Sequence, residues 1–212
     1  NIRETMVNQE SSQTGVLRVG DLQIRLILPG ARPESPDRIS FWWGVTSSSL
    51  ALARFIESSN SFSNRDVLEL GSGVGLGGLV ASLKGARVTF TDYMDEALDT
   101  ARQNTIINKA YDENVRFVNL DWEFPVPVGV FDIIIGSEIV YDYLTHSSLE
   151  KLIINALKPH GVIVIADRDR MVVNRFMGRL IQKGFSCHKT GVMISDPGFP
   201  LQEITIYVLE RL

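Results

Sequence analysis

The sequence has little cysteine and little histidine: among 212 residues there are one cysteine, Cys187, and three histidines. A single cysteine cannot form an internal disulfide, and neither Cys187 nor His146 and His160 has the spacing of a metal-ligand cluster. We therefore expect no structural metal and expect these three side chains to be structural or exposed. One unpaired thiol is typical of a reducing compartment, which predicts a cytoplasmic location.

The sequence also lacks a basic excess and long apolar runs. Its 21 Lys and Arg stand against 25 Asp and Glu, a net charge of −4, so it has no positive field of the kind that binds phosphate backbones. No run approaches the ~18 apolar residues of a membrane span, and residues 1–15 are too polar for a signal sequence. We expect a globular monomer that binds neither nucleic acid nor membranes.

The first forty residues predict an extension before the main fold. Two short apolar runs, 16–19 and 22–28, are separated by Gly20 and Asp21, which indicates a β-hairpin. Three prolines and a glycine in 29–36 predict a loop. We interpret residues 1–40 as an N-terminal hairpin and loop, and the whole chain, 1–212, as a single domain with its core at 41–212.

From residue 45 onward, helical and strand-like patterns alternate. Expected helices lie at 45–58, 76–83, 96–107, 147–157 and 172–182, and expected strands at 66–70, 87–91, 115–119, 131–136 and 162–166. Apolar strands alternating with amphipathic helices predict an α/β fold whose mostly parallel sheet is covered on both faces. The strand-like runs 185–194 and 203–210 have no helix between them, so we expect an antiparallel edge.

The strongest motif is a buried strand that runs into a glycine-rich turn, Glu69-Leu70-Gly71-Ser72-Gly73-Val74-Gly75. Glycines allow a tight turn and a close approach of the backbone to a ligand. Asp92 ends the next strand 19 residues after Gly73, the spacing at which a carboxylate binds the ribose hydroxyls of a nucleoside. Together they predict a cofactor that contains adenosine, with Ser72 and Tyr93 beside it.

Gly73, Gly75 and Gly78 also satisfy the dinucleotide fingerprint Gly-x-Gly-x-x-Gly, so an NAD-binding protein is an alternative. Glu69 argues against it, because a carboxylate beside the loop repels a pyrophosphate but suits the positive sulfonium and ammonium groups of S-adenosylmethionine, directly or by ordering the loop. A further alternative is that the glycines only turn the chain, with Asp92 capping the next helix.

Two later strand ends supply further candidates. Asp121 and Trp122 follow the third expected strand and suit the amino group and face of an adenine, although Trp122 also suits a core position. Ser137, Glu138 and Tyr141 follow the fourth strand at the same sheet edge. A carboxylate and a phenol there can position an amine for in-line methyl transfer, although a helix cap and a packed aromatic explain them too.

With these motifs in hand, the sequence resembles the seven-β-strand protein lysine methyltransferases, the branch acting on chaperones, elongation factors and calmodulin. The likeness covers residues 41–212: the glycine motif at 69–75, Asp92, the element 120–122, and a motif of the form Asp/Glu-x-x-Tyr/Phe at 138–141.

The resemblance implies a Rossmann-like sheet of order 3-2-1-4-5-7-6 with strand 7 antiparallel. It also implies S-adenosylmethionine as cofactor, a protein lysine as acceptor contacted by the Glu138 motif, and an aromatic before the first helix, Trp43 or Trp42, that closes over the cofactor. Two other activities stay open: a methyltransferase acting on a small molecule and a noncatalytic binding module. For the charged run 167–170, a solvated loop is the favoured interpretation over a lining of the acceptor mouth.

Overall fold

The structure, a computed structural model, describes residues 13–29 and 44–212. The helices are α1 (Ser47–Ser58), α2 (Leu76–Leu83), α3 (Asp95–Ile107), α4 (His146–Ala156) and α5 (Met171–Gln182). The strands are β1 (Gln13–Val19), β2 (Leu22–Leu28), β3 (Asp66–Leu70), β4 (Arg87–Asp92), β5 (Val115–Asn119), β6 (Phe131–Ser137), β7 (Leu157–Asp167), β8 (Phe185–Ile194) and β9 (Gln202–Arg211).

The seven strands β3 to β9 form one sheet in the order β5-β4-β3-β6-β7-β9-β8. Strands β3 to β7 are parallel, whereas β9 is antiparallel to both of its neighbours. Counted along the chain this order is 3-2-1-4-5-7-6, so the predicted topology, including the antiparallel ending, is confirmed. From β3 the chain builds the sheet outward in one direction through β4 and β5, and then in the other direction from β6 onward. Open α/β sheets bind ligands at the point where the direction changes.

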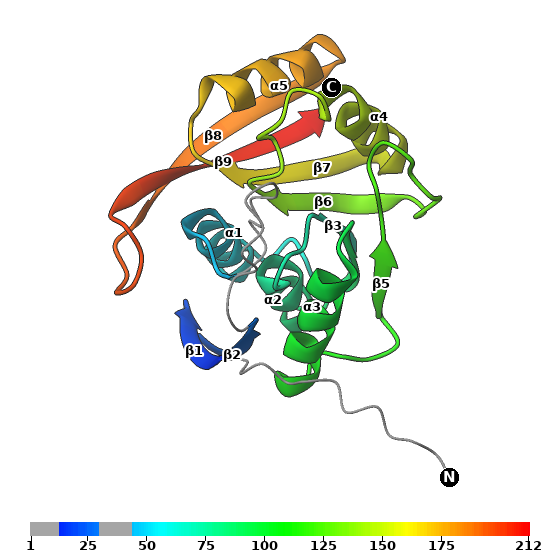
Figure 1. The fold of residues 1–212 in the computed structure, drawn as a ribbon. Coiled ribbons are helices and arrows are strands. Elements are labelled where there is room, and N and C mark those ends of the chain that lie inside the picture. Colours follow the sequence, from blue (N-terminus) through cyan, green and yellow to red (C-terminus); the bar gives the residue numbers. More distant parts are fainter. Residues whose placement is uncertain (1–12, 30–43) are drawn as a thin grey trace.

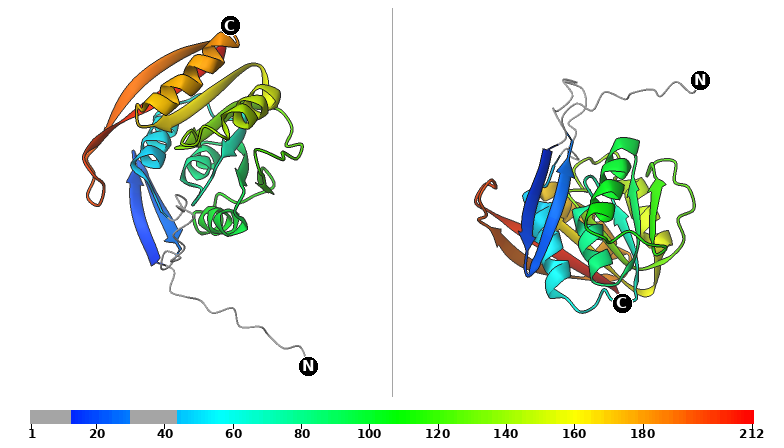
Figure 2. Two further views of the ribbon diagram at one scale, coloured as in Figure 1. Left: turned by 45° about the horizontal axis from the view of Figure 1, so that its top comes forward. Right: turned by 90° about the horizontal axis from the view of Figure 1, so that it is seen from below.

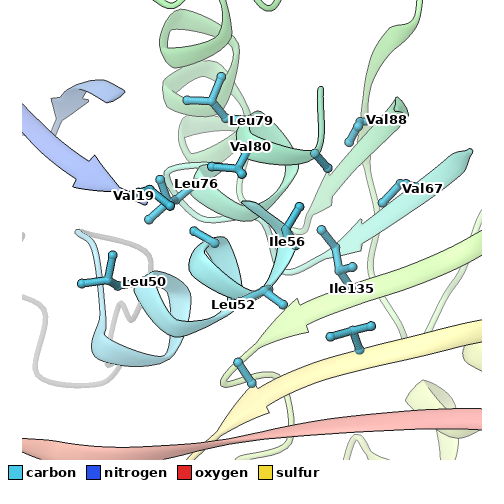
Figure 3. Close-up of a cluster of buried hydrophobic side chains, with 14 of the residues drawn as sticks. Val19, Leu50, Leu52, Ile56, Val67, Leu76, Leu79, Val80, Val88 and Ile135 are labelled. Carbon is cyan, nitrogen blue, oxygen red and sulfur yellow. The ribbon is translucent and has the colours of Figure 1, made fainter. Parts of the chain in front are cut away.

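Helices cover both faces of this sheet (Figure 1). Alternate residues of each central strand point to opposite faces: Val67 packs in the cluster that contains α1, α2 and α3, whereas Leu68 packs in the cluster that contains α4 and α5. Figure 3 shows the first cluster, where Leu52 and Ile56 of α1 face the sheet. The near-continuous apolar strands of the sequence are thus explained by burial on both sides.

The N-terminal hairpin is also confirmed, with β1 and β2 paired from Gln13↔Leu28 to Val19↔Leu22. Gly20 in its two-residue turn has φ +55°, a left-handed value that favours glycine. Val19 and Ile24 are fully buried and belong to the α1–α3 cluster. The hairpin therefore packs on the same face as the helices that follow it.

The largest difference from the expected elements is at β7, which begins at Leu157 rather than at residue 162. Leu157 pairs with Phe131 across an irregularity in the register, so the segment after α4 joins the sheet at once. The predicted loop beyond Pro29 lies outside the described residues. In the described parts of the chain, no helix is both long and apolar enough to cross a membrane.

Candidate functional site

A cavity of about 360 Å³ opens where the carboxyl ends of the central strands meet. This volume is in the ~300–1,000 Å³ range of small-molecule sites. Its walls come from the start of α1, the glycine-rich turn after β3, the end of β4, the segment after β5 and the segment after β6. The sequence predicted that these strand ends would meet at one edge, and they do.

Most of the predicted site residues line this cavity: Glu69, Gly71, Ser72, Gly73, Asp92, Tyr93, Asp121, Trp122, Ser137, Glu138 and Tyr141. Gly75 is not among the lining residues, and Trp43, like Trp42, lies outside the described residues. Sequence reasoning did not single out ten others: Gly44, Thr46, Ser49, Val74, Leu76, Gly77, Leu120, Glu123, Ile139 and Thr145. Most of them directly flank predicted residues. Thr46, the N-cap of α1, and Ser49, in the first turn of α1, do not, and the sequence held no signal that marked them.

The glycine-rich turn is fixed to the neighbouring strand β4. Gly71 and Gly73 have φ values of +61° and +51°, which only glycine adopts without strain. Between them, the Ser72 N–H donates to the carbonyl of Thr91 at 2.9 Å, and the Gly73 N–H donates to Asp92 Oδ2 at 3.0 Å. The backbone of the turn is therefore held in place before any ligand arrives.

Asp92 connects the turn with the following helix. Besides Gly73, its carboxylate accepts the N–H of Met94 at 3.1 Å through Oδ1, and Met94 is the residue that precedes α3. Burial raises the pKa of the Asp92 carboxyl above its usual value, which these backbone hydrogen bonds partly offset. Asp92 therefore orders the segment before α3 but does not cap that helix, whose N-cap residue Met94 makes no side-chain capping bond. Each carboxylate oxygen retains a lone pair for a ligand.

Glu69 lies almost completely buried under the turn. Its Oε1 accepts the N–H of Gly78 in the first turn of α2 at 2.9 Å, and its Oε2 has no hydrogen-bond partner. A Cβ at Gly77 or Gly78 would lie 2.6 Å and 2.7 Å from these carboxyl oxygens. The paired glycines therefore create the space in which the Glu69 side chain fits.

This arrangement explains why the glycine pattern does not suit a dinucleotide. A pyrophosphate is normally bound by the free N–H groups at the N-terminus of the helix after the turn. Here a carboxyl group already occupies part of that position, because Glu69 accepts the Gly78 N–H. Gly75 serves packing instead, since a Cβ there would lie 2.7 Å from the Cβ of Ala101 in α3.

Asp121 and Trp122 form the wall of the cavity after β5. Asp121 Oδ1 accepts the N–H of Glu123 at 2.8 Å, which orders the short turn. Trp122 packs partly against the α4–α5 cluster, and its ring would lie 3.7 Å from a Cβ on Gly71. The tryptophan is therefore both a core-contacting residue and a cavity wall, so the two interpretations are compatible.

Glu138 lines the cavity after β6 and is held by contacts with α1 and β7. Its φ is +53°, an uncommon value for a residue other than glycine. Its N–H donates to the carbonyl of Ala166 in β7 at 3.0 Å, and its carboxylate accepts the hydroxyl hydrogen of the buried Ser48 at 2.9 Å. The carboxylate is thus positioned by α1 rather than used as a helix cap.

Ser48 lies in the first turn of α1, where Thr46 caps the helix by accepting the N–H of Ser49 at 3.1 Å. Ser48 and Glu138 are 90 residues apart, so no local pattern could reveal their contact. Tyr141, the other predicted acceptor residue, is 44% exposed at the cavity wall, and burial raises the pKa of its phenol. Its hydroxyl is therefore protonated at neutral pH.

The charged run 167–170 is solvated in part, as the sequence favoured: Arg168 and Asp169 are exposed, whereas Asp167, the last residue of β7, is not. Asp167 is fully buried, and its carboxylate pairs with Arg170 at 2.7 Å. Burial raises the pKa of the Asp167 carboxyl to about 6, and the neighbouring Glu138 adds to that effect. Arg168 Nε lies 3.8 Å from Glu138 Oε1. None of the four residues of the run lines the cavity.

The chain was compared with models of known protein families. A family model described as lysine methyltransferase matches residues 41–183. The chain belongs to the lysine methyltransferase family. The match begins at the segment before α1 and ends just after α5.

Among curated relatives, EEF1A lysine methyltransferase 3 from Mus musculus is 32% identical over 66% of this chain and 62% of its own length. Protein N-lysine methyltransferase METTL21A from Xenopus tropicalis is 33% identical over 59% of this chain and 60% of its own. The chain thus aligns with less than two thirds of these members of the lysine methyltransferase family. A longer alignment, 88% of this chain and 85% of the relative at 27% identity, links it to the protein N-terminal and lysine N-methyltransferase efm7 of Schizosaccharomyces pombe.

Solved structures share the fold of this chain. The Thermus thermophilus 16S rRNA N2 G1207 methyltransferase, solved with AdoMet and guanosine, superposes with a TM-score of 0.69 at 16% identity over 95% of this chain and 51% of that chain. A putative RNA methyltransferase from Pyrococcus horikoshii has a TM-score of 0.61 at 19% identity over 77% and 83% of the two chains. Likeness at this identity concerns the fold alone.

The remaining singled-out residues are not among those that line the cavity. His146 is almost completely buried, with its ring beside those of Tyr143 and Phe176, and Cys187 is a half-buried free thiol. His160 is exposed, with φ +64°. Within residues 13–29 and 44–212, no group of three or more His, Cys, Asp or Glu side chains is arranged to hold a metal ion.

Glu69 leads to a prediction about pH. Burial raises the pKa of its carboxyl to about 8 from a reference value of 4.5. Between these values the folded protein holds a proton that the unfolded chain has released, so the free energy of unfolding falls as pH rises, by up to ~1.4 kcal/mol per pH unit. Glu69→Gln is isosteric and does not titrate, so we expect a shallower fall.

Urea unfolding of both proteins at pH 5, 6, 7 and 8, without ligand, measures this difference. The other titrating groups are the same in both proteins, so the difference between the two pH profiles isolates Glu69. Equal slopes across the window would mean that the buried carboxyl is ionised throughout and that the protonated form described above does not exist.

Proposed function

We propose that the protein binds S-adenosylmethionine in this cavity and transfers its methyl group to a lysine side chain of a protein. The observation that carries the proposal is the charge of the cavity wall. Among the described lining residues, five bear a carboxyl group and no lysine, arginine or histidine is present: Glu69, Asp92, Asp121, Glu123 and Glu138. Such a wall suits a cationic donor and a cationic acceptor, and it opposes a phosphate-rich ligand.

The donor fits the part of the cavity around the glycine-rich turn. Asp92 would accept hydrogen bonds from the ribose hydroxyls, and Trp122 with Asp121 would border the adenine. The amino-acid end of the donor would lie toward Glu69, whose buried Oε2 has no hydrogen-bond partner. A positive group near Glu69 would lower the pKa of this carboxyl, so donor binding would favour its ionised form.

When bound, the donor supplies an electrophilic methyl carbon attached to a positively charged sulfur. The acceptor nitrogen must arrive with an unprotonated lone pair in line with the carbon–sulfur bond. Glu138, held by Ser48, attracts the lysine side chain and orients it, although a carboxylate by itself favours the charged form of the amine. Tyr141 offers a phenol oxygen that can accept one N–H of the neutral amine. Binding and orientation are therefore the main roles of this pair.

The names of the curated relatives differ in the group that is methylated. The relatives include a histidine protein methyltransferase homolog from Dictyostelium discoideum, and efm7, which is named for both N-terminal and lysine methylation. An imidazole, an α-amine and a lysine amine are all nitrogen nucleophiles. Two of these three groups are cations at neutral pH, and the acidic cavity wall favours those two.

The test is to incubate the protein with S-adenosylmethionine that carries a labelled methyl group, together with a protein extract in which endogenous methylation has been inactivated. Labelled proteins are separated by size, and the labelled bands are hydrolysed to identify the modified amino acid. We expect one or a few discrete bands that yield methyllysine, and strongly reduced label with Asp92→Asn or Glu138→Gln.

Each other outcome identifies a specific error. Label in methylhistidine or at an N-terminus would support the proposed donor site and show that the acceptor is not a lysine. Label confined to small molecules would exclude a protein substrate. No label with any extract, although the donor binds, would favour a noncatalytic binding module.

Ser48 provides a prediction for the acceptor end. Ser48→Ala removes the hydroxyl that donates to the Glu138 carboxylate at 2.9 Å, so the position of that side chain is less well fixed. We expect the methylation rate at saturating donor to fall about fivefold to tenfold, the effect of one buried hydrogen bond, with donor affinity unchanged. Ser58→Ala, at the exposed far end of the same helix, is the matched control and should leave the rate unchanged.

A further inference from the structure

A buried asparagine in α3, Asn104, contacts both the N-terminal hairpin and the glycine-rich turn. Its side chain is fully buried. Its Oδ1 accepts the N–H of Ile27 at 2.7 Å, and its Nδ2 donates to the carbonyl of Ile27 at 3.2 Å and to the carbonyl of Val74 at 2.9 Å. Val74 lies in the turn, between Gly73 and Gly75, and lines the cavity.

A second asparagine, Asn108, repeats the contact with the hairpin one helical turn later. Its Oδ1 accepts the N–H of Arg25 at 2.9 Å, and its Nδ2 donates to the carbonyl of Arg25 at 2.6 Å. Four residues along a helix advance ~6 Å, and two residues along a strand advance ~6.8 Å. The two amides therefore match alternate residues of β2 and pair with its backbone as a neighbouring strand would.

Figure 2 shows β2 running alongside α3 on the face of the sheet that also carries α1 and α2. The face of α3 that meets the turn is close-packed, because Ala101, one turn before Asn104, contacts Gly75. Only Asn104 of the two asparagines reaches the turn. Asn108 donates instead to the carbonyl of Asn104 in its own helix, at 2.7 Å.

We infer that Asn104 is a positioning residue for the methyl donor, through which the N-terminal hairpin and the donor-binding turn are held as one unit. The inference rests on the proposed donor site and goes beyond it, because it assigns the hairpin a part in donor binding. Without the amide of Asn104, the carbonyl of Val74 would be a buried acceptor with no protein donor, and the turn would shift to satisfy it.

Asn104 and Asn108 form a matched pair for the test. Asn104→Ala removes the bonds to the hairpin and the bond to the turn, whereas Asn108→Ala removes the same kind of hairpin bonds and leaves Val74 untouched. Asn104→Ser, which keeps a polar group at the buried position, replaces Asn104→Ala if the alanine variant does not fold. Circular dichroism and the melting temperature of each variant establish that it is folded.

The first measurement is the affinity for S-adenosylhomocysteine by calorimetry, together with the donor KM and kcat where activity is found. We expect the Asn104 variant to bind about tenfold more weakly, with a raised donor KM and an unchanged kcat at saturating donor. Asn108→Ala should bind within about twofold of wild type. Equal losses in both variants, or a fall in kcat alone, would overturn the inference.

The second measurement needs no ligand and separates this inference from the proposed function. Amide hydrogen exchange of residues 71–75 should be faster in the Asn104 variant than in wild type, and unchanged in Asn108→Ala. If wild type binds no S-adenosylhomocysteine but the exchange differs as expected, the proposed function fails and the link between hairpin and turn stands. If the exchange of these residues is the same in all three proteins, the link itself is wrong.

Discussion

Replacing Asp92 with asparagine is expected to weaken the binding of S-adenosylhomocysteine by about a hundredfold. The two carboxylate oxygens of Asp92 accept the N–H groups of Gly73 and Met94. Asparagine has only one acceptor oxygen, so one of these N–H groups would face an NH₂ group and lose its partner. The substitution also removes the negative charge that strengthens hydrogen bonds from the ribose hydroxyls.

Asp95→Asn is the matched control for this prediction. Asp95 is an exposed carboxylate three residues further on, and it accepts from the side chain of Asn119 at 2.7 Å. Titration calorimetry of both variants and wild type measures the effect. Donor affinity within a few-fold of wild type in Asp92→Asn would contradict the placement of the ribose at this carboxylate.

Glu138→Gln is expected to lower the methylation rate by about a hundredfold, the effect of misplacing a reacting group, and to leave donor affinity unchanged. Glutamine keeps the shape of the side chain and can still accept the Ser48 hydroxyl. It removes the charge that attracts the acceptor amine, so the acceptor KM should rise as well. The initial rate of methyl incorporation at saturating donor is the quantity to measure.

The control for this variant is Glu113→Gln, which removes one exposed carboxylate from the loop before β5 and so matches the change in net charge. It should methylate as wild type does. If Glu138→Gln is fully active, the acceptor does not contact this side chain. If the variant instead loses donor binding, Glu138 belongs to the donor half of the cavity.

The alternation of strands and helices, the antiparallel edge and many of the residues in the cavity wall could be predicted from the sequence because they follow from local patterns. The strand order was implied by the resemblance to a known family. Near-continuous apolar strands, the glycine-rich turn and acidic residues at strand ends are each visible within about ten residues, and parallel strands bring their carboxyl ends to one edge. Glu69, Asp92 and Glu138 could therefore be placed together before any coordinates were known.

What sequence reasoning missed depends on contacts between distant segments. Ser48 contacts Glu138 across 90 residues, and Asn104 contacts Ile27 across 77. Nothing near Ser48 or Asn104 marks either as different from any other polar residue of an amphipathic helix. The early start of β7 has the same cause, because Leu157 joins the sheet only through its pairing with Phe131.

The ionisation state of buried groups could not be predicted from the sequence either. The pattern around Glu69 indicated a carboxylate that would attract a cation, but burial raises its pKa to about 8 in the protein without ligand. In the same way, the run 167–170 has the composition of a solvated loop, yet Asp167 is fully buried. Burial is a property of the folded packing, and four charged residues in a row do not reveal it.

The central claim is that the acidic cavity is a site for S-adenosylmethionine and not for a dinucleotide. Its most direct test is to titrate the protein calorimetrically with S-adenosylmethionine and, separately, with NAD. We predict saturable binding of one S-adenosylmethionine per chain, strongly weakened in Asp92→Asn, and no measurable heat with NAD. Binding of NAD without binding of S-adenosylmethionine would contradict both the donor site proposed at the glycine-rich turn and the methyl transfer inferred from it.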